Sequence, residues 1–88
     1  MSIKILEVPD LNDEVSVLSK LILYNSNHLW EDVIYQLEKA TGYSIIQCEQ
    51  IATFAHTKGK ATVKSGELKE LNGINSILKE INLITIIE

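Results

Sequence analysis

The sequence contains one cysteine, one proline and no long apolar run. A single cysteine, Cys48, cannot form a disulfide within the chain, so the fold does not depend on oxidation. No stretch approaches the about 18 consecutive apolar residues that a membrane-spanning helix needs. The first residues also lack the basic-then-apolar pattern of a secretory signal. These absences predict a cytoplasmic protein without a membrane partner.

Positive charge is also scarce. Lys and Arg together number 8 against 12 Asp and Glu residues, which gives a formal net charge of −4. A sequence-independent grip on DNA or RNA needs cationic side chains that neutralise phosphates. We therefore expect no nucleic-acid partner, whereas an acidic domain suits a partner that carries positive charge, such as an amine.

Aromatic residues make up only 6% of the chain, although hydrophobic residues reach 45% of its 88 residues. The core must therefore consist mostly of Ile, Leu, Val and Ala. This length suits one small domain. Residues 1–19 are interpreted as an N-terminal arm or tail, because a short alternation at Ile3 and Ile5 is interrupted by Pro9 and an acidic stretch. Residues 20–88 form the predicted domain.

The predicted domain opens with a strand and a helix. Residues 20–24 are predicted to form a strand, because the consecutive apolar residues 21–24 are typical of a strand with both faces at least partly covered. A helix is predicted over residues 29–41, with Asn27 as its N-cap and Gly42 as its left-handed end. The apolar residues of this helix share one face: Trp30, Val33, Ile34 and Leu37.

A second helix and a second strand follow. The helix begins at Ser44, whose spacing to Gln47 is that of a capping box, and Gly59 is positioned to end it. Residues 60–64 alternate polar and apolar side chains, as expected for a strand with one solvated face. Residues 65–66 are predicted to form a turn.

The last third of the domain predicts one more helix and one more strand. Apolar residues recur at helical spacing over residues 68–81, and Gly73 is a candidate point at which this helix breaks. The β-branched run at 83–87 predicts a well-buried strand. Three short strands must share one sheet. The predicted fold is a small α+β domain of β-α-α-β-α-β order, a three-stranded antiparallel sheet with helices on one face.

Several segments in this order resemble a known family. Residues 21–25 form a strand that runs into an Asn-containing turn, and a helix follows over residues 31–39. Residues 55–61 read Ala-His-Thr-Lys-Gly-Lys-Ala, a histidine shortly before a Gly-Lys step and a strand. The last five residues, 84–88, are similar to a closing strand. Together, from residue 21 to residue 88, the chain resembles the ClpS-like adaptors of the ATP-dependent Clp protease.

The resemblance implies an adaptor that is not an enzyme and needs no cofactor. Members of that family bind N-degron substrates, which are proteins that begin with a bulky hydrophobic residue. They deliver these proteins to an ATP-driven Clp unfoldase and protease. The implied partners are therefore the N-terminal domain of a Clp unfoldase and protein substrates with a free hydrophobic N-terminus.

The resemblance also assigns a substrate-binding site to residues of this chain. Asn25 and His56 match the positions that read the substrate's α-amino group. Ser26 and Asn27 occupy two turn positions that are acidic in the family. Trp30 lies at the pocket mouth. The pocket walls match Val33, Ala52 and Ala55.

Simpler interpretations of the same residues remain open. Asn25 is common in turns for backbone reasons, and a histidine near a helix end such as His56 often serves packing or the helix dipole. Trp30 at helical spacing suits a core residue. Cys48 could be combined with a histidine into a metal site or a thiol nucleophile, but its apolar helix face favours a structural role.

Two other functions also remain open. The chain could be a divergent interaction module that keeps the ClpS fold and has lost amine recognition. By fold analogy alone, it could also be a helper of the ribosomal-stalk type. The sequence shows no Gly-rich phosphate loop and no nucleophile elbow, so an enzyme is the least favoured class.

Overall fold

The structure, a computed structural model, describes residues 18–88. The predicted arm over residues 1–19 lies outside the described residues except for its last two positions, and its boundary remains a prediction. The elements are β1 (Ser19–Tyr24), α1 (Trp30–Thr41), α2 (Ile45–Lys58), β2 (Lys60–Gly66), α3 (Leu68–Leu78), the 3₁₀ helix η1 (Lys79–Ile81) and β3 (Thr85–Ile87). This order confirms the predicted α+β fold.

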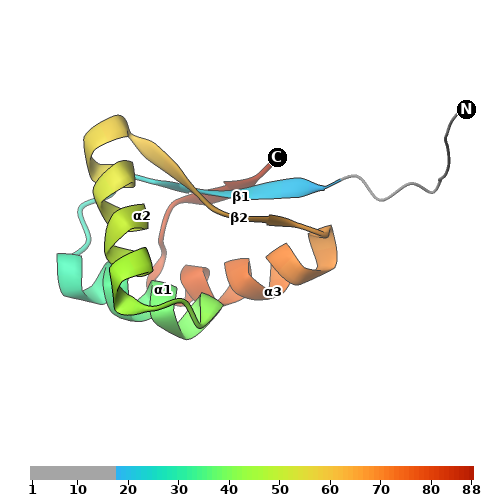
Figure 1. Cartoon of the computed structure of the whole chain (residues 1–88), viewed down its shortest axis with the longest axis horizontal. Helices are drawn as coiled ribbons and strands as arrows, with labels where there is room; N and C mark the ends of the chain where they lie inside the picture. The colour runs from blue at the N-terminus through green and yellow to red at the C-terminus, as the bar shows by residue number, and fades with distance from the viewer. Residues whose placement is uncertain (1–17) are drawn as a thin grey trace, which may run out of the picture.

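The three strands form one antiparallel sheet in the order β2-β1-β3. Leu23 in the central strand lies opposite Ala61 on one side and Thr85 on the other. Figure 1 shows α1 and α3 beneath the sheet, with α2 beside them leading to the start of β2. The helices therefore cover one face of the sheet, as predicted.

The core between the sheet and the helices is aliphatic, as the low aromatic content predicts. Its largest buried side chains are leucines, with Leu21, Leu37, Leu71 and Leu78 at 0% exposure. Burying one leucine contributes about 1.5–3 kcal/mol. These leucines come from β1, α1 and α3, so the same residues that stabilise the fold also fix how the helices lie on the sheet.

Glycine and serine define the helix ends at the predicted positions. Gly42 has φ 76° after α1, and Gly59 has φ 93° after α2. Both adopt the left-handed conformation, which glycine reaches without the steric cost of a Cβ. At the start of α2, the Ser44 Oγ accepts a hydrogen bond from the backbone N–H of Gln47 at 3.2 Å. The sequence therefore predicted these three boundaries correctly.

The start of α1 differs from its prediction. Leu29, with φ −63° and ψ 141°, is the N-cap residue, and no side chain caps the helix. The first helical hydrogen bond joins the Val33 N–H to the Leu29 carbonyl oxygen. The predicted N-cap, Asn27, is wrong because it lies two residues too early to reach the free N–H groups of the first turn.

Tertiary pairing also changes the middle of the chain. The predicted turn at residues 65–66 is wrong, because Ser65 and Gly66 continue β2 and pair with Lys20 and Ser19. The predicted break at Gly73 is wrong as well, since α3 continues through it. Gly73 lowers helix propensity by about 1 kcal/mol relative to alanine, which packing of α3 against the sheet and α1 overcomes.

The last strand is shorter and less buried than expected. β3 spans Thr85–Ile87, and Thr85 faces the core at 7% exposure. Ile84 and Ile86, however, are 52% and 44% exposed. The prediction of a well-buried strand is wrong because β3 is an edge strand and the helices cover only the opposite face of the sheet.

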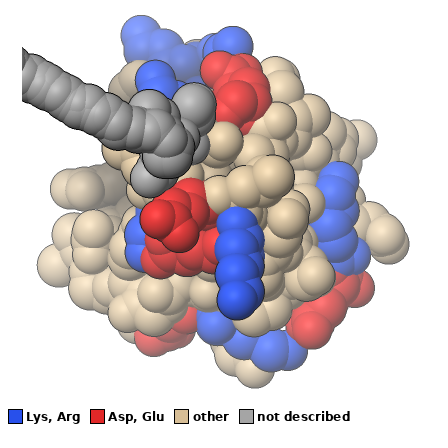
Figure 2. Space-filling model, turned by 90° about the vertical axis from the view of Figure 1, so that its right-hand side faces the viewer, with Lys and Arg blue, Asp and Glu red and all other residues tan. Residues whose placement is uncertain are grey.

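The end of the domain that carries the start of α3 displays charges of both signs. The Lys64 Nζ and the Glu70 Oε2 form an ion pair at 2.6 Å there. Figure 2 shows lysine side chains interspersed with acidic ones on this face, so it presents no continuous basic patch. Within residues 18–88, no helix is long and apolar enough to cross a membrane.

Candidate functional site

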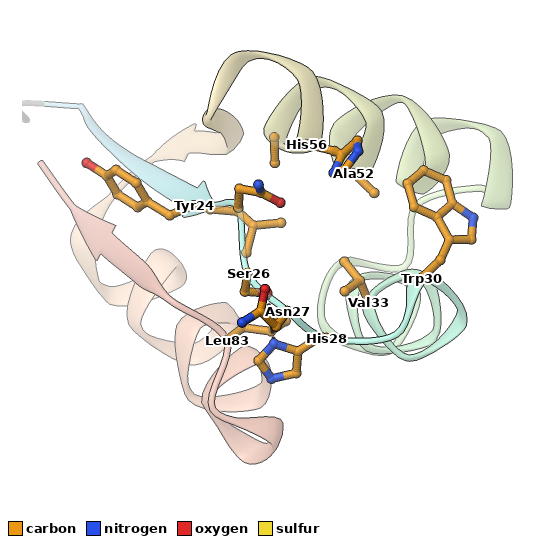
Figure 3. A pocket seen from close by; sticks show the side chains of 12 residues that line it. Tyr24, Ser26, Asn27, His28, Trp30, Val33, Ala52, His56 and Leu83 are labelled. Atoms are coloured by element: carbon orange, nitrogen blue, oxygen red, sulfur yellow. Dashed lines mark hydrogen bonds between the residues drawn. The ribbon is translucent and has the colours of Figure 1, made fainter.

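A cavity of about 270 Å³ opens where the turn after β1 meets α1 and α2 (Figure 3). Its lining comes from the end of β1, this turn, both helices and the segment before β3. All eight residues of the predicted binding site line it: Asn25, Ser26, Asn27, Trp30, Val33, Ala52, Ala55 and His56. The fold therefore brings the predicted residues together, and their role in binding remains a prediction.

Backbone hydrogen bonds hold the turn against the end of α2. The Asn25 N–H donates to the Gly59 carbonyl oxygen at 2.9 Å, and the Gly59 N–H donates to the Ala55 carbonyl oxygen at 2.9 Å. On the other side, the Tyr24 N–H donates to the Ile84 carbonyl oxygen at 2.8 Å. These bonds fix the position of Asn25 relative to the last turns of α2, which carry His56.

The side chains approach the cavity from different elements. Figure 3 shows His56 and Ala52 descending from α2, Trp30 and Val33 rising from α1, and Ser26 on the turn. The polar groups thus come from the turn and from α2, while α1 contributes apolar groups. A ligand with one polar end and one apolar end matches this division.

Small side chains create the hollow. Ala52 and Ala55 lie three residues apart on α2 at 5% and 3% exposure, and Val33 faces them from α1 at 9%. Because an alanine side chain ends at Cβ, this pair leaves space that larger residues would fill. Trp30 is 44% exposed, so it borders the opening and is not a core residue.

The polar groups of the cavity include amides, a hydroxyl and imidazoles. No Asp, Glu, Lys or Arg lines it. Asn25 and His56 are exposed, and neither side chain is hydrogen-bonded to another residue within 18–88. Their polar atoms are thus available to a ligand, in a cavity that offers no carboxylate of its own.

His28 is a lining residue that the sequence did not identify as part of the binding site. The Ser26 Oγ lies 2.8 Å from the His28 Nδ1, and the His28 Nε2 lies 2.5 Å from the Ile81 carbonyl oxygen. The Ser-x-His spacing was a local signal for the first contact. No local pattern reveals the second contact, because it joins residues 53 positions apart.

Three further lining residues were also missed, and they are apolar or aromatic: Leu23, Tyr24 and Leu83. Leu23 and Leu83 are 2% and 1% exposed, so they close the inner end of the cavity. Strand and core residues of this kind are common in any sequence. Their contribution to the cavity follows from the tertiary packing.

Cys48 lies away from this site. It is fully buried on α2, and its Sγ donates to the Tyr43 carbonyl oxygen at 3.9 Å. Burial, assisted by the Glu38 carboxylate, raises the pKa of the Cys48 thiol, which disfavours the reactive thiolate. Over residues 18–88, no group of three or more His, Cys, Asp or Glu side chains is arranged to hold a metal ion.

Comparisons with known proteins agree with this fold. A family model described as "ATP-dependent Clp protease adaptor protein ClpS" matches residues 11–81. Among solved structures, Agrobacterium tumefaciens ClpS2 bound to L-phenylalaninamide superposes with a TM-score of 0.70 at 23% identity, covering 81% of this chain and 94% of that chain. No curated protein matches the sequence.

These two matches carry different weight. At 23% identity, the likeness to ClpS2 establishes the fold and nothing finer. The family model spans most of the chain, from residue 11 to residue 81, and includes the whole turn and both helices of the cavity. The resemblance seen in the sequence is thereby confirmed, and the chain belongs to the ClpS family of ATP-dependent Clp protease adaptor proteins.

Proposed function

We propose that this adaptor binds N-degron substrates by a free N-terminal amine and a bulky hydrophobic first side chain, and delivers them to a Clp unfoldase. The observation that carries the proposal is that Asn25, Ser26 and His56 line the same cavity as a set of apolar side chains. The proposal makes the chain a binding protein without catalysis, cofactor or metal.

Three of the polar groups in the cavity can match the three donors of an α-ammonium group. An ammonium has three N–H donors and no acceptor. The Asn25 amide oxygen, the Ser26 hydroxyl oxygen and a neutral His56 ring nitrogen supply three acceptors. Each hydrogen bond to a charged group contributes about 1.5–3 kcal/mol, so this arrangement favours a free amine over an acetylated one.

The apolar part of the cavity suits one side chain. The whole cavity has a volume of about 270 Å³, just below the about 300–1,000 Å³ of drug-sized ligand pockets. It can therefore enclose a single hydrophobic side chain and not a longer peptide segment. The structural neighbour ClpS2 was solved with L-phenylalaninamide, a ligand with a free amine and one aromatic side chain, and this supports the proposal.

The turn lacks the carboxylates that the resemblance leads one to expect at Ser26 and Asn27. A neutral acceptor keeps the hydrogen bond to the ammonium but loses the attraction between opposite charges. A loss of up to about 1.5–3 kcal/mol corresponds to at most roughly ten- to hundredfold in affinity. We therefore expect this chain to bind free N-termini more weakly than a relative with an acidic turn, and to depend more on the apolar pocket.

A peptide titration tests amine recognition. A fluorescent peptide that begins with Phe or Leu should bind the full chain, and its N-acetylated form should bind at least about tenfold more weakly, since acetylation removes a charge and two donors. Equal binding of the two forms, or binding of neither, would contradict the proposal.

Matched variants locate the binding site. Asn25→Ala and His56→Ala should each weaken binding of the free-amine peptide. Thr53→Ala, a substitution on the exposed outer face of α2, is the control and should leave the affinity unchanged. Thermal unfolding of all three variants separates loss of binding from loss of folding.

One observation favours a second candidate. Because no carboxylate lines the cavity, the chain could be a divergent interaction module that keeps the fold but has lost amine recognition. A pull-down with the isolated N-terminal domain of a Clp unfoldase distinguishes the two candidates. Capture of that domain together with amine-dependent peptide binding supports the adaptor, while capture without peptide binding supports the divergent module.

A further inference from the structure

His28 links the binding turn to the C-terminal part of the chain through both of its ring nitrogens. The Nδ1 atom faces the Ser26 hydroxyl at 2.8 Å, and the Nε2 atom faces the Ile81 carbonyl oxygen at 2.5 Å. Ile81 ends η1 and lies just before the Asn82 turn, where φ is 60°. The ring is therefore held between the Ser26 hydroxyl, which lines the cavity, and the Ile81 carbonyl group, which is part of η1.

The position of one proton follows from the chemistry of Ile81. A carbonyl oxygen can only accept a hydrogen bond, so the His28 Nε2 must carry a hydrogen. In a neutral imidazole one ring nitrogen is a donor and the other an acceptor. The Nδ1 atom of neutral His28 is then the acceptor, and the Ser26 hydroxyl donates its only hydrogen to it.

This arrangement decides what Ser26 offers to a ligand. A hydroxyl has one hydrogen and two acceptor lone pairs. With the hydrogen directed to His28, the Ser26 Oγ presents only lone pairs to the cavity. It can accept from an amine and cannot donate to a carboxylate or carbonyl group. A neutral residue thereby performs part of the role of an acceptor-only carboxylate.

We infer that His28 is a positioning residue for amine recognition: it fixes the Ser26 hydroxyl as an acceptor that faces the ligand. The inference rests on the proposed function, in which Ser26 contacts the amine of the substrate. His28 itself needs no contact with the ligand. Figure 3 shows its ring below Ser26 and Asn27, beside Leu83 of the C-terminal segment.

A purely structural role for His28 is the competing explanation, because the bond to Ile81 also anchors the turn. Two amide substitutions separate these roles. His28→Asn places an amide oxygen near the Nδ1 position, so it keeps an acceptor for Ser26 and gives up the bond to Ile81. His28→Gln places an amide nitrogen near the Nε2 position, so it keeps the anchor and gives up the acceptor.

The test titrates the free-amine peptide into the full-length chain and both variants. The inference expects His28→Asn to bind within a few-fold of the unmodified chain and His28→Gln to bind about tenfold more weakly. It also expects that, once Ser26 is replaced by alanine, adding His28→Gln does not weaken peptide binding further, because His28 acts through Ser26. Equal weakening in the two amide variants, or a larger loss in His28→Asn, would overturn it.

A spectroscopic measurement provides a readout that does not depend on the ligand. Long-range ¹⁵N–¹H correlation spectra of the free chain should show neutral His28 with its hydrogen on Nε2. The opposite tautomer would overturn the inference while leaving the proposed function intact. If the unmodified chain binds neither the free nor the acetylated peptide, the proposed function and this inference both fail. The two failures are therefore distinguishable, because the opposite tautomer overturns the inference alone.

Discussion

The backbone N–H of Asn25 donates to the carbonyl oxygen of Gly59, 2.9 Å away. This bond joins the end of β1 to the end of α2, two points that lie 34 residues apart in numbering (59 minus 25). It fixes the first residue of the binding turn beside the helix end that carries His56. The candidate site therefore depends on how α2 ends.

The first prediction concerns that helix end. Gly59 has φ 93°, and nothing lies within 4 Å of a Cβ built there. Gly59→Ala should therefore meet no collision, and its cost should come from the left-handed backbone, about 1–2 kcal/mol. Urea unfolding measures the loss of stability, and the peptide titration should show weaker binding as the Asn25 contact is disturbed.

Gly73→Ala is the matched control for that substitution. Gly73 lies inside α3 with open space around its Cβ position and without a positive φ. Alanine there should raise the free energy of unfolding by about 0.4–1 kcal/mol and leave peptide binding unchanged. Similar effects of the two substitutions would contradict the conformational explanation.

The second prediction fills the apolar part of the cavity. In Ala52→Leu, the larger side chain should occupy space that we assign to the first side chain of the substrate. Loss of that burial costs about 1.5–3 kcal/mol of binding, or roughly ten- to hundredfold in affinity for a Phe peptide. Thr53→Leu adds a similar side chain to the exposed outer face of α2 and should bind normally. Equal affinities in the two variants would exclude this cavity as the side-chain pocket.

The third prediction concerns a buried amide. Gln36 in α1 is 3% exposed, and its Nε2 donates to the Ile77 carbonyl oxygen at 2.6 Å and to the Glu80 Oε1 at 3.0 Å. Gln36→Ala leaves the Ile77 oxygen without this donor, so we expect a loss of about 1–3 kcal/mol in unfolding free energy. Lys39→Ala breaks only the exposed pair with Glu80 and should have a smaller effect. If Gln36→Ala lowers the unfolding free energy no more than Lys39→Ala does, water replaces the Gln36 amide as the donor to the Ile77 oxygen.

The fourth prediction is a pH dependence at the same contact. Hydrogen bonds from Lys39 and then from Gln36 lower the pKa of the Glu80 carboxyl below its ordinary value. The stability that this shift contributes is present above the ordinary pKa of a glutamate and is lost as pH falls through the lowered value. The pKa of Lys39 is raised by its hydrogen bond to Glu80, so the lysine contribution is lost only as pH rises through that raised value.

Glu80→Gln tests the acid side of this dependence. The difference in unfolding free energy between the unmodified chain and the variant should be largest near neutral pH and shrink in acid, where Glu80 is protonated. Because the pair is exposed, added salt should reduce the difference as well. A difference that is independent of pH would mean that the glutamate acts through packing and not through charge.

Local chemistry accounts for the parts of the fold that the sequence predicted well. Gly42 and Gly59 ended their helices because a left-handed residue without a Cβ costs little there, and Ser44 capped α2 through a hydrogen bond to the next turn. Periodic apolar residues correctly placed three helices on one face of a three-stranded sheet. The helices and their ends depend on residues within about two helical turns of one another.

Features that depend on distant partners were predicted less well. Ser65 and Gly66 have turn-forming composition, yet they pair with Lys20 and Ser19 and become strand. Asn27 has capping chemistry, but α1 begins too late for it to cap. For Ser65 and Gly66, pairing with β1 outweighed the local turn preference.

The sequence by itself determined the family, the order of the elements and eight of the twelve residues that line the cavity. The tertiary structure alone decided that Leu23 and Leu83 close this cavity, and that His28 joins Ser26 to the Ile81 carbonyl oxygen. The physical reason is that a hydrogen bond to a backbone carbonyl carries no side-chain signature. Its partner is set by where η1 meets the turn, and that position follows from the packing of α3 against the sheet.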